Sequence, residues 1–184
     1  MLDHKVELAF FLAVVVVQRI AIGVKLLRHH IFIYSAFIDV LFFADDFQLV
    51  GFPDGLHETD EGMQNWLRWI ESNRPALNHY SIFEDGKYCG ESFYEIDAEH
   101  QSAALDIKLF GFARGRGIAT AGLSHAIKEA FRNGAEIVWV DPNPENKKAI
   151  SLYKRLGFQQ KDFPEYLISE DEEQTSLYME LRKN

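Results

Sequence analysis

A short stretch of glycines and arginines at residues 112–120 has the residue types of a phosphate-binding loop. Gly115 and Gly117 carry no Cβ atom, so successive backbone N–H groups there can point into one space. A helix predicted to begin directly after them adds the unpaired N–H groups of its first turn and the positive end of its dipole. Because Arg114 and Arg116 add positive charge, the stretch favours a phosphate or pyrophosphate group. A tight turn without a ligand is the alternative interpretation.

The segments on either side of this loop predict the elements that position it. An alternating strand pattern at residues 104–110 precedes the loop, and a helical pattern follows it and ends at Gly134, a residue suited to a C-cap. A second strand pattern at 136–140 leads into a turn and then a helical pattern at 147–156, which stops at Gly157. Strands and helices therefore alternate here, which predicts a mixed α/β sheet.

Two ordered motifs in this part of the chain resemble those of the Gcn5-related N-acetyltransferase (GNAT) superfamily. The first resembles the family's Arg/Gln-x-x-Gly-x-Gly/Ala loop and is met by Arg114, Gly117 and Ala119. The second resembles its Asn…Ala…Leu-Tyr…Gly-Phe signature, which is matched by Asn146, Ala149, Leu152, Tyr153, Gly157 and Phe158. The resemblance covers residues 81–158, and the nearest branch in motif is the aminoglycoside 6′-N-acetyltransferase-like branch.

The resemblance implies an α/β (α+β) GNAT fold, with a mixed, mostly antiparallel central sheet that is flanked by helices and splayed at the acetyl-CoA site. It also implies acetyl-CoA as co-substrate, with no metal. The acetyl group would pass to a primary amine of a small cationic molecule, aminoglycoside-like or polyamine-like, by direct attack in a ternary complex. Protein N-terminal or lysine acetylation, and a non-catalytic acyl-CoA-binding domain, remain alternatives.

A dinucleotide-binding enzyme is a further alternative, because Gly115-x-Gly117 follows a predicted strand and Asp141 ends the next one, where a ribose-binding acid would lie. The third glycine position of that fingerprint is occupied by Thr120. Too little sequence follows Asp141 to complete the sheet of such a fold. The GNAT resemblance is therefore the preferred interpretation.

The resemblance also carries over individual site residues. The residues expected to bind the cofactor are Leu109, Arg114, Gly115, Arg116, Gly117, Ile118, Ala119, Thr120 and Asn146. Tyr153 has the position of the family's tyrosine near the CoA sulphur and is the candidate general acid. Asp106, on the strand before the loop, is the candidate general base, with Glu91 and Glu95 as alternatives. Each has a purely structural alternative, such as a helix N-cap for Asn146 or a solvated strand face for the glutamates.

Composition limits the partners. The 184-residue chain is long enough for one domain with a sizeable core, which we take as residues 1–184 with residues 1–50 atypical for the family. A net charge of −9 and a pI near 5.2 argue against nucleic acid and would suit a cationic or peptide amine acceptor. The single cysteine, Cys89, and the lack of metal-ligand spacing favour a reducing, cytoplasmic setting. A homodimer is expected from family habit.

The N-terminal part of the chain contains a wholly apolar run at residues 8–17, which is shorter than a membrane span requires and is preceded by acidic residues. We expect a buried strand there and no membrane association. Further along, Asp85-Gly86 predicts a hairpin. A helix beginning at Thr59 or Asp60 should end before Pro75 and place its paired tryptophans, Trp66 and Trp69, in the core.

Side-chain positions follow from the same patterns. The helix after the loop is expected to bury Ala119, Leu123, Ala126, Ile127 and Ala130, and to expose His125, Lys128, Glu129 and Arg132. His79, His100 and His125 are all expected at the surface. A final strand at residues 176–181 should point Leu177, Met179 and Leu181 inward.

Overall fold

The structure is a computed structural model that describes residues 18–20, 24–28, 60–168 and 175–184. The predicted strand at residues 8–17 lies outside these ranges. In the described part of the chain, eight strands form one sheet in the order β1-β2-β3-β4-β5-β6-β8-β7. The strands are β1 (Gln18–Ile20), β2 (Val24–Arg28), β3 (Leu77–Glu84), β4 (Lys87–Asp97), β5 (Ser102–Leu109), β6 (Ile137–Val140), β7 (Gln159–Lys161) and β8 (Tyr178–Arg182).

All neighbouring strands in this sheet are antiparallel except β5 and β6, which run parallel. The predicted mixed, mostly antiparallel sheet is therefore confirmed. The predicted hairpin is also present, because Glu84 pairs with Lys87 and both turn residues, Asp85 (φ 50°) and Gly86 (φ 80°), have positive φ. Positive φ at both central positions gives the turn the twist of the strands that it joins.

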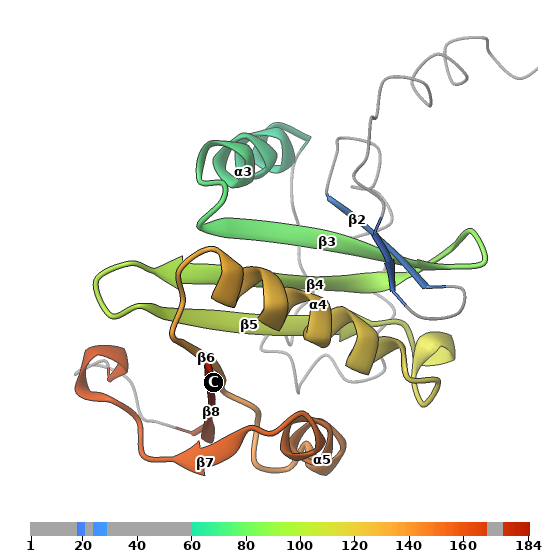
Figure 1. Cartoon of the computed structure of the whole chain (residues 1–184). Coiled ribbons are helices and arrows are strands. Elements are labelled where there is room, and N and C mark those ends of the chain that lie inside the picture. Colours follow the sequence, from blue (N-terminus) through green and yellow to red (C-terminus); the bar gives the residue numbers. More distant parts are fainter. Residues whose placement is uncertain (1–17, 21–23, 29–59, 169–174) are drawn as a thin grey trace, which may run out of the picture.

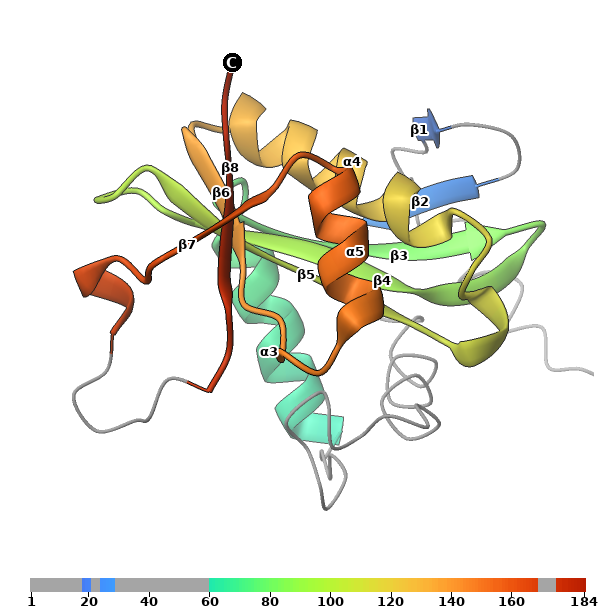
Figure 2. The ribbon, with the colours of Figure 1, turned by 90° about the horizontal axis from the view of Figure 1, so that it is seen from below.

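The described helices are α3 (Asp60–Ser72), α4 (Ile118–Arg132), α5 (Lys147–Arg155) and the short 3₁₀ turns η3 (Gly111–Ala113) and η4 (Glu165–Leu167). Figures 1 and 2 show α4 along one face of the sheet and α3 on the opposite side. The helix α5 lies beside the end of the sheet formed by β6 and β8 (Figure 2).

The helix α3 buries Leu67 and Ile70, but not both of its tryptophans. Trp66 is half-buried and Trp69 is 43% exposed, so the prediction that both belong to the core is wrong for Trp69. At 3.6 residues per turn, Trp69 lies well over a quarter turn from the line between Leu67 and Ile70 that faces the sheet. Trp69 therefore lies on the side of α3 that faces away from the sheet.

The inner face of α4 differs from the predicted one. Ile118, Gly122, His125 and Glu129 are buried on it together with Leu123 and Ala126, whereas Ala119 and Ile127 are only half-buried. The helix lies close to the sheet at Gly122, where an added Cβ would come within 2.8 Å of Ile82 Cδ1 and 2.9 Å of Ile107 Cδ1. Because Gly122 faces the sheet, residues three and seven positions further along face it too.

Partners within the fold explain why polar residues are tolerated on that face. The ring of His125 meets Tyr80 edge-on at 4.6 Å, and the Glu129 carboxylate lies 3.2 Å from Arg132 Nη1. The surface prediction for His125 and Glu129 was therefore wrong. A similar correction applies to β8, where Glu180 is 9% exposed because both its oxygens bond, one to the Tyr178 hydroxyl and one to Arg182.

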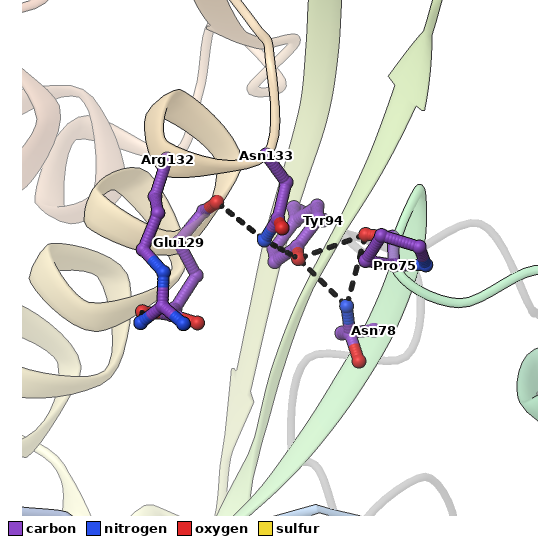
Figure 3. Close-up of polar contacts among 6 residues, drawn as sticks. All are labelled: Pro75, Asn78, Tyr94, Glu129, Arg132 and Asn133. Atoms are coloured by element: carbon purple, nitrogen blue, oxygen red, sulfur yellow. Dashed lines mark hydrogen bonds and ion pairs between the residues drawn. The ribbon is translucent and has the colours of Figure 1, made fainter.

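A buried tyrosine fixes the C-terminal end of α4 to the start of β3 (Figure 3). The Tyr94 hydroxyl donates to the Pro75 carbonyl at 3.0 Å and accepts from the side-chain amides of Asn78 (2.6 Å) and Asn133 (2.9 Å). Asn133 also donates to the Glu129 carbonyl at 2.8 Å. Tyr94 is fully buried, so these bonds satisfy a hydroxyl that would otherwise be costly to bury. The position of α4 on the sheet is anchored there.

Candidate functional site

The sheet opens between its two parallel strands. The ladder of β5 and β6 has three pairs, from Ser102↔Ile137 to Ala104↔Trp139, although β5 continues to Leu109. Figure 2 shows β6 turning away from β5 beyond this point. Residues 105–109 of β5 therefore have no strand partner on this side among the described residues. An open strand edge of this kind can hydrogen-bond an extended ligand as if it were an added strand, as the predicted splay requires.

The open edge leads directly into the glycine loop. Gly115 (φ 74°) and Gly117 (φ 81°) both have left-handed backbones, and Gly117 is the N-cap of α4. A Cβ added at either glycine would meet nothing within 4 Å. In the part of the chain that the structure describes, the amides of Gly115, Arg116 and Gly117 donate to no other backbone group. The loop thus has the space and the donors of an anion cradle.

The two loop arginines are tied to neighbouring groups. Arg116 Nη2 lies 2.6 Å from Glu84 Oε2, and Arg114 Nε donates to the Leu109 carbonyl at 3.1 Å. Arg116 nonetheless keeps half of its side chain exposed. Because Glu84 offsets part of its charge, the loop is less positive than two free arginines would make it. The remaining predicted residues, Ile118, Ala119 and Thr120, form the first turn of α4.

On the other side of the opening, α5 carries Tyr153. The helix starts at Asn146, whose Oδ1 accepts from the Ala149 amide at 3.1 Å, so Asn146 is an N-cap. Tyr153 lies two turns along, is 7% exposed, and packs against Phe158 with ring centroids 5.7 Å apart. The capped helix α5 thus places its motif residues at the edge of the opening between β5 and β6.

Two carboxylates lie near the Tyr153 hydroxyl, and their effect appears in the pKa of the phenol. Burial raises the pKa of Tyr153, and the negative charges of Asp106 and Asp141 raise it further. The pKa of Asp141 is raised in turn, first by burial of its carboxyl group and then by Asp106, although the residue as a whole is exposed. The opening between β5 and β6 therefore brings together three side chains, those of Asp106 on β5, Asp141 after β6 and Tyr153 on α5.

Asp106 lies on the sheet face opposite to α4, because its neighbour Ile107 reaches Gly122 of α4 and successive strand residues point to opposite faces. Its Oδ1 accepts from the Ile107 amide at 2.7 Å, and its Oδ2 lies 3.2 Å from Lys108 Nζ. Both oxygens are therefore engaged. To accept a proton from an amine, the carboxylate would have to weaken its contact with Lys108.

A buried acid lies across the ladder from that lysine. Glu91 is directly opposite Lys108 in the β4–β5 register and is 2% exposed, which contradicts its prediction as a solvated strand residue. Its Oε2 lies 3.9 Å from Nδ1 of His79, which is 6% exposed and stacks on Phe93 with centroids 4.7 Å apart. The surface prediction for His79 was therefore wrong. Glu95, in contrast, is exposed as predicted.

The sequence reasoning missed Lys108 altogether. The available signal was a second charged residue in a mostly apolar strand, two residues after Asp106 and hence on the same face. Elsewhere, His100 is exposed as predicted and lies 2.6 Å from Asp97, and this contact lowers the pKa of Asp97. Cys89 is buried.

The described residues offer neither a metal site nor a membrane-spanning helix. They contain no group of three or more histidine, cysteine or acidic side chains arranged to hold a metal ion. They also contain no helix of the length and apolarity needed to cross a bilayer.

Comparisons with known proteins agree with this geometry. A family model described as the acetyltransferase (GNAT) family matches residues 42–158. An uncharacterized N-acetyltransferase of Methanocaldococcus jannaschii is 51% identical over 49 residues, a stretch that spans 27% of this chain and 22% of that protein. The sequence match to this curated relative therefore covers only about a fifth of its length.

Solved structures of similar fold cover most of the chain. The ribosomal alpha-N-protein acetyltransferase RimL superposes with a TM-score of 0.69 at 12% identity, covering 90% of this chain and 92% of that one. A spermidine N-acetyltransferase from Vibrio cholerae, solved with CoA and spermine, also gives a TM-score of 0.69, at 14% identity and with 87% and 95% covered. At these identities the likeness concerns the fold alone.

Proposed function

The chain belongs to the acetyltransferase (GNAT) family, and on that premise we propose that it transfers an acetyl group from acetyl-CoA to a primary amine. The observation that carries the proposal is the continuity of three features: the open edge of β5, the glycine loop at its end, and Tyr153 beside the opening. Together they offer hydrogen bonds for an extended arm, a cradle for its phosphates, and a proton donor near the reacting group. A tight turn without a ligand would not require an open strand edge before it or a buried tyrosine beside it.

In this proposal, the pantetheine arm lies along residues 106–109, with Leu109 contributing backbone hydrogen bonds, and the pyrophosphate lies on the amides of residues 114–120. The fit is supported by the space in front of Gly115 and Gly117, which any side chain would occupy. Arg114 and Arg116 would then exchange part of their present contacts with Leu109 and Glu84 for phosphate oxygens. Asn146 contributes by starting α5 at the correct place.

When bound, acetyl-CoA supplies a thioester carbonyl that a neutral amine can attack. The new C–N bond replaces the C–S bond, so one proton leaves the amine and one must reach the departing thiolate. We assign the first proton to Asp106, directly or through water, and assign the second to the Tyr153 hydroxyl. The raised pKa of Tyr153 keeps its proton in place but makes complete transfer to an ordinary thiolate uphill. Its main contribution is therefore a hydrogen bond that strengthens as charge develops on sulphur.

Two acceptor classes are consistent with the family. A small cationic amine is favoured by the net charge of −9, and one fold neighbour is titled as a spermidine N-acetyltransferase. A peptide N-terminus or lysine is the alternative, and another neighbour is titled as a ribosomal alpha-N-protein acetyltransferase.

We further propose that residues 1–184 act as one domain, that the protein forms a homodimer as is common in the family, and that it works in the cytoplasm, as the single cysteine suggests.

The deciding experiment is calorimetric titration of the purified chain with acetyl-CoA, followed by a thiol-release assay over monoamines, polyamines, aminoglycosides and peptides with a free N-terminus. We expect binding, and release of thiol only when an acceptor is present. Binding with no turnover for any acceptor would favour the non-catalytic acyl-CoA-binding alternative. Absence of binding would reject the cofactor assignment itself.

A further inference from the structure

Lys108 occupies a place in the splayed site where its charge bears on the choice of acceptor. Its side chain is 22% exposed, and its Nζ lies 3.2 Å from Asp106 Oδ2. Across the β4–β5 ladder it faces Glu91, which is almost fully buried. The ammonium group of Lys108 therefore pairs with the Asp106 carboxylate, and a second carboxylate, that of Glu91, lies across the ladder on the same face of the sheet.

The charge of this lysine is retained at neutral pH. Burial by itself lowers the pKa of Lys108, but the negative charges of Asp106 and Glu91 outweigh burial, so the pKa is raised. The arrangement is tied to the rest of the fold through His79, which lies 3.9 Å from Glu91 and is stacked on Phe93. A fixed cation is thus present beside the carboxylate that the acceptor amine approaches.

We propose that Lys108 is a specificity-determining residue, whose ammonium fills the space between Asp106 and Glu91 that the second ammonium of a diamine or polyamine would otherwise take. Of the acceptors proposed above, the site then favours those that bring a single amine, such as a small monoamine or a peptide N-terminus, over the polycations that the overall net charge would suit. This inference rests on the proposed function, since it assumes that the acceptor amine reaches Asp106 and Tyr153.

Asp141 does not replace the site that Lys108 fills. Asp141 also lies near Asp106, but burial and the charge of Asp106 raise its pKa, so it holds a negative charge less readily. A second ammonium placed near Glu91 would meet Lys108 as a like charge. Like charges a few ångströms apart in a partly buried site repel strongly enough to change an affinity about tenfold or more.

The test compares two acceptors that differ by one charge, propylamine and 1,3-diaminopropane, by their kcat/KM ratio. Lys108→Met removes the cation and exposes both carboxylates, so the ratio of diamine to monoamine should rise about tenfold, mainly through a lower KM for the diamine. Lys108→Arg keeps the charge and should keep the wild-type ratio. The double variant Lys108→Met with Glu91→Gln removes the second anion as well and should return the ratio to the wild-type value.

An active Lys108→Met enzyme with an unchanged ratio would overturn the inference. If that variant does not fold, the wild-type enzyme still decides, because a diamine-to-monoamine ratio of kcat/KM at or below unity would support a filled second site, and a ratio above unity would contradict it. The proposed function is judged separately. It fails if acetyl-CoA is not bound and no amine is acetylated, whereas the inference fails alone if amines are acetylated with polycations preferred.

Discussion

Tyr153 combines burial with two neighbouring carboxylates, and both effects keep the proton on its oxygen. A phenol in this state is a hydrogen-bond donor throughout the pH range of an ordinary assay. The same raised pKa makes it a weak acid, so its catalytic effect should fall at the low end of the range for positioned acids, about 100-fold. Its ring, in contrast, belongs to the core through Phe158.

The substitution Tyr153→Phe separates these two roles, because phenylalanine keeps the ring and removes only the hydroxyl. We expect kcat to fall about 100-fold, with the acetyl-CoA dissociation constant within about threefold of wild type. Steady-state kinetics and calorimetry would measure the two quantities. Tyr166→Phe is a matched control, since Tyr166 is 37% exposed on η4 and should change neither. Loss of acetyl-CoA binding with unchanged kcat would refute the role of the hydroxyl.

Single residues also show where sequence reasoning succeeds. The loop glycines, Asn146 and Tyr153 could be selected because short motifs fix their spacing along the chain. The burial of Glu91 and His79 could not, because it depends on which residue of the neighbouring strand lies opposite. A glutamate is read as solvated until a cation such as Lys108 is known to face it.

At the scale of elements, α4 has a left-handed glycine at each end. Gly117 is its N-cap at φ 81°, and Gly134 follows its C-cap at φ 112°. An added Cβ meets nothing within 4 Å at either position. A side chain therefore costs similar backbone strain at both ends, about 1–3 kcal/mol, while only the Gly117 end faces the proposed phosphate cradle.

This symmetry gives a controlled test of the cradle. Gly117→Val should lower acetyl-CoA affinity at least about 100-fold, because the side chain enters the space proposed for the phosphates and disturbs the amides around it. Gly134→Val should lose a similar amount of stability and retain affinity within about threefold. Calorimetric titration and thermal unfolding of both variants would measure these effects. Equal affinities in the two variants would remove the phosphate assignment.

The Tyr94 hydroxyl anchors the opposite end of the same helix to β3. Removing it in Tyr94→Phe leaves the amides of Asn78 and Asn133 with fewer partners in a buried place, which typically costs about 1–3 kcal/mol. For a chain of this size, about 2–4 °C of melting temperature is lost per kcal/mol. Calorimetric melting would detect the loss. A variant as stable as the Tyr166→Phe control would show that the hydroxyl network contributes nothing to the docking of α4.

The bounds of the helices were predicted more accurately than the faces that they bury. The capping residues and glycines set the bounds of α4 and α5 closely, because those signals are local. The rotation of α4 about its axis was predicted wrongly, since the apolar stripe alone does not reveal that Gly122 makes the closest approach or that His125 has Tyr80 as a partner. The opening of the sheet was predicted only from the family resemblance, because the sequence of a strand does not reveal which strands pair with it or where the pairing stops.

For the whole molecule, buried tyrosines couple folding to pH. Folding raises the pKa values of Tyr88, Tyr94, Tyr153 and Tyr178, four of the chain's seven tyrosines, and burial is the largest cause for each. Nearby carboxylates add to the effect, Glu91 at Tyr88 and Glu180 at Tyr178. The protein already carries a net charge of −9, so each further phenolate would also add to general repulsion.

A group whose pKa is raised by folding holds its proton more tightly in the native state than in the unfolded chain. Its contribution to stability is complete below the unfolded pKa, about 10 for tyrosine, and is lost as the pH rises through the native value. We therefore expect the free energy of unfolding to fall steeply above about pH 10. Lys108 acts in the same direction, because the charges of Asp106 and Glu91 raise its pKa against the effect of burial, and its ion pair with Asp106 needs its proton.

Urea unfolding at a series of pH values from 7 to about 11 would measure this loss, with tyrosinate absorbance followed in the same samples. Absorbance from the four phenols whose pKa values are raised by burial should appear only as the protein unfolds. If all tyrosines ionised near pH 10 while the far-UV spectrum stayed native, the phenols would have to be solvated. That outcome would contradict the burial of Tyr153 beside Asp106 and Asp141, and with it the placement of the proposed proton donor at the splay.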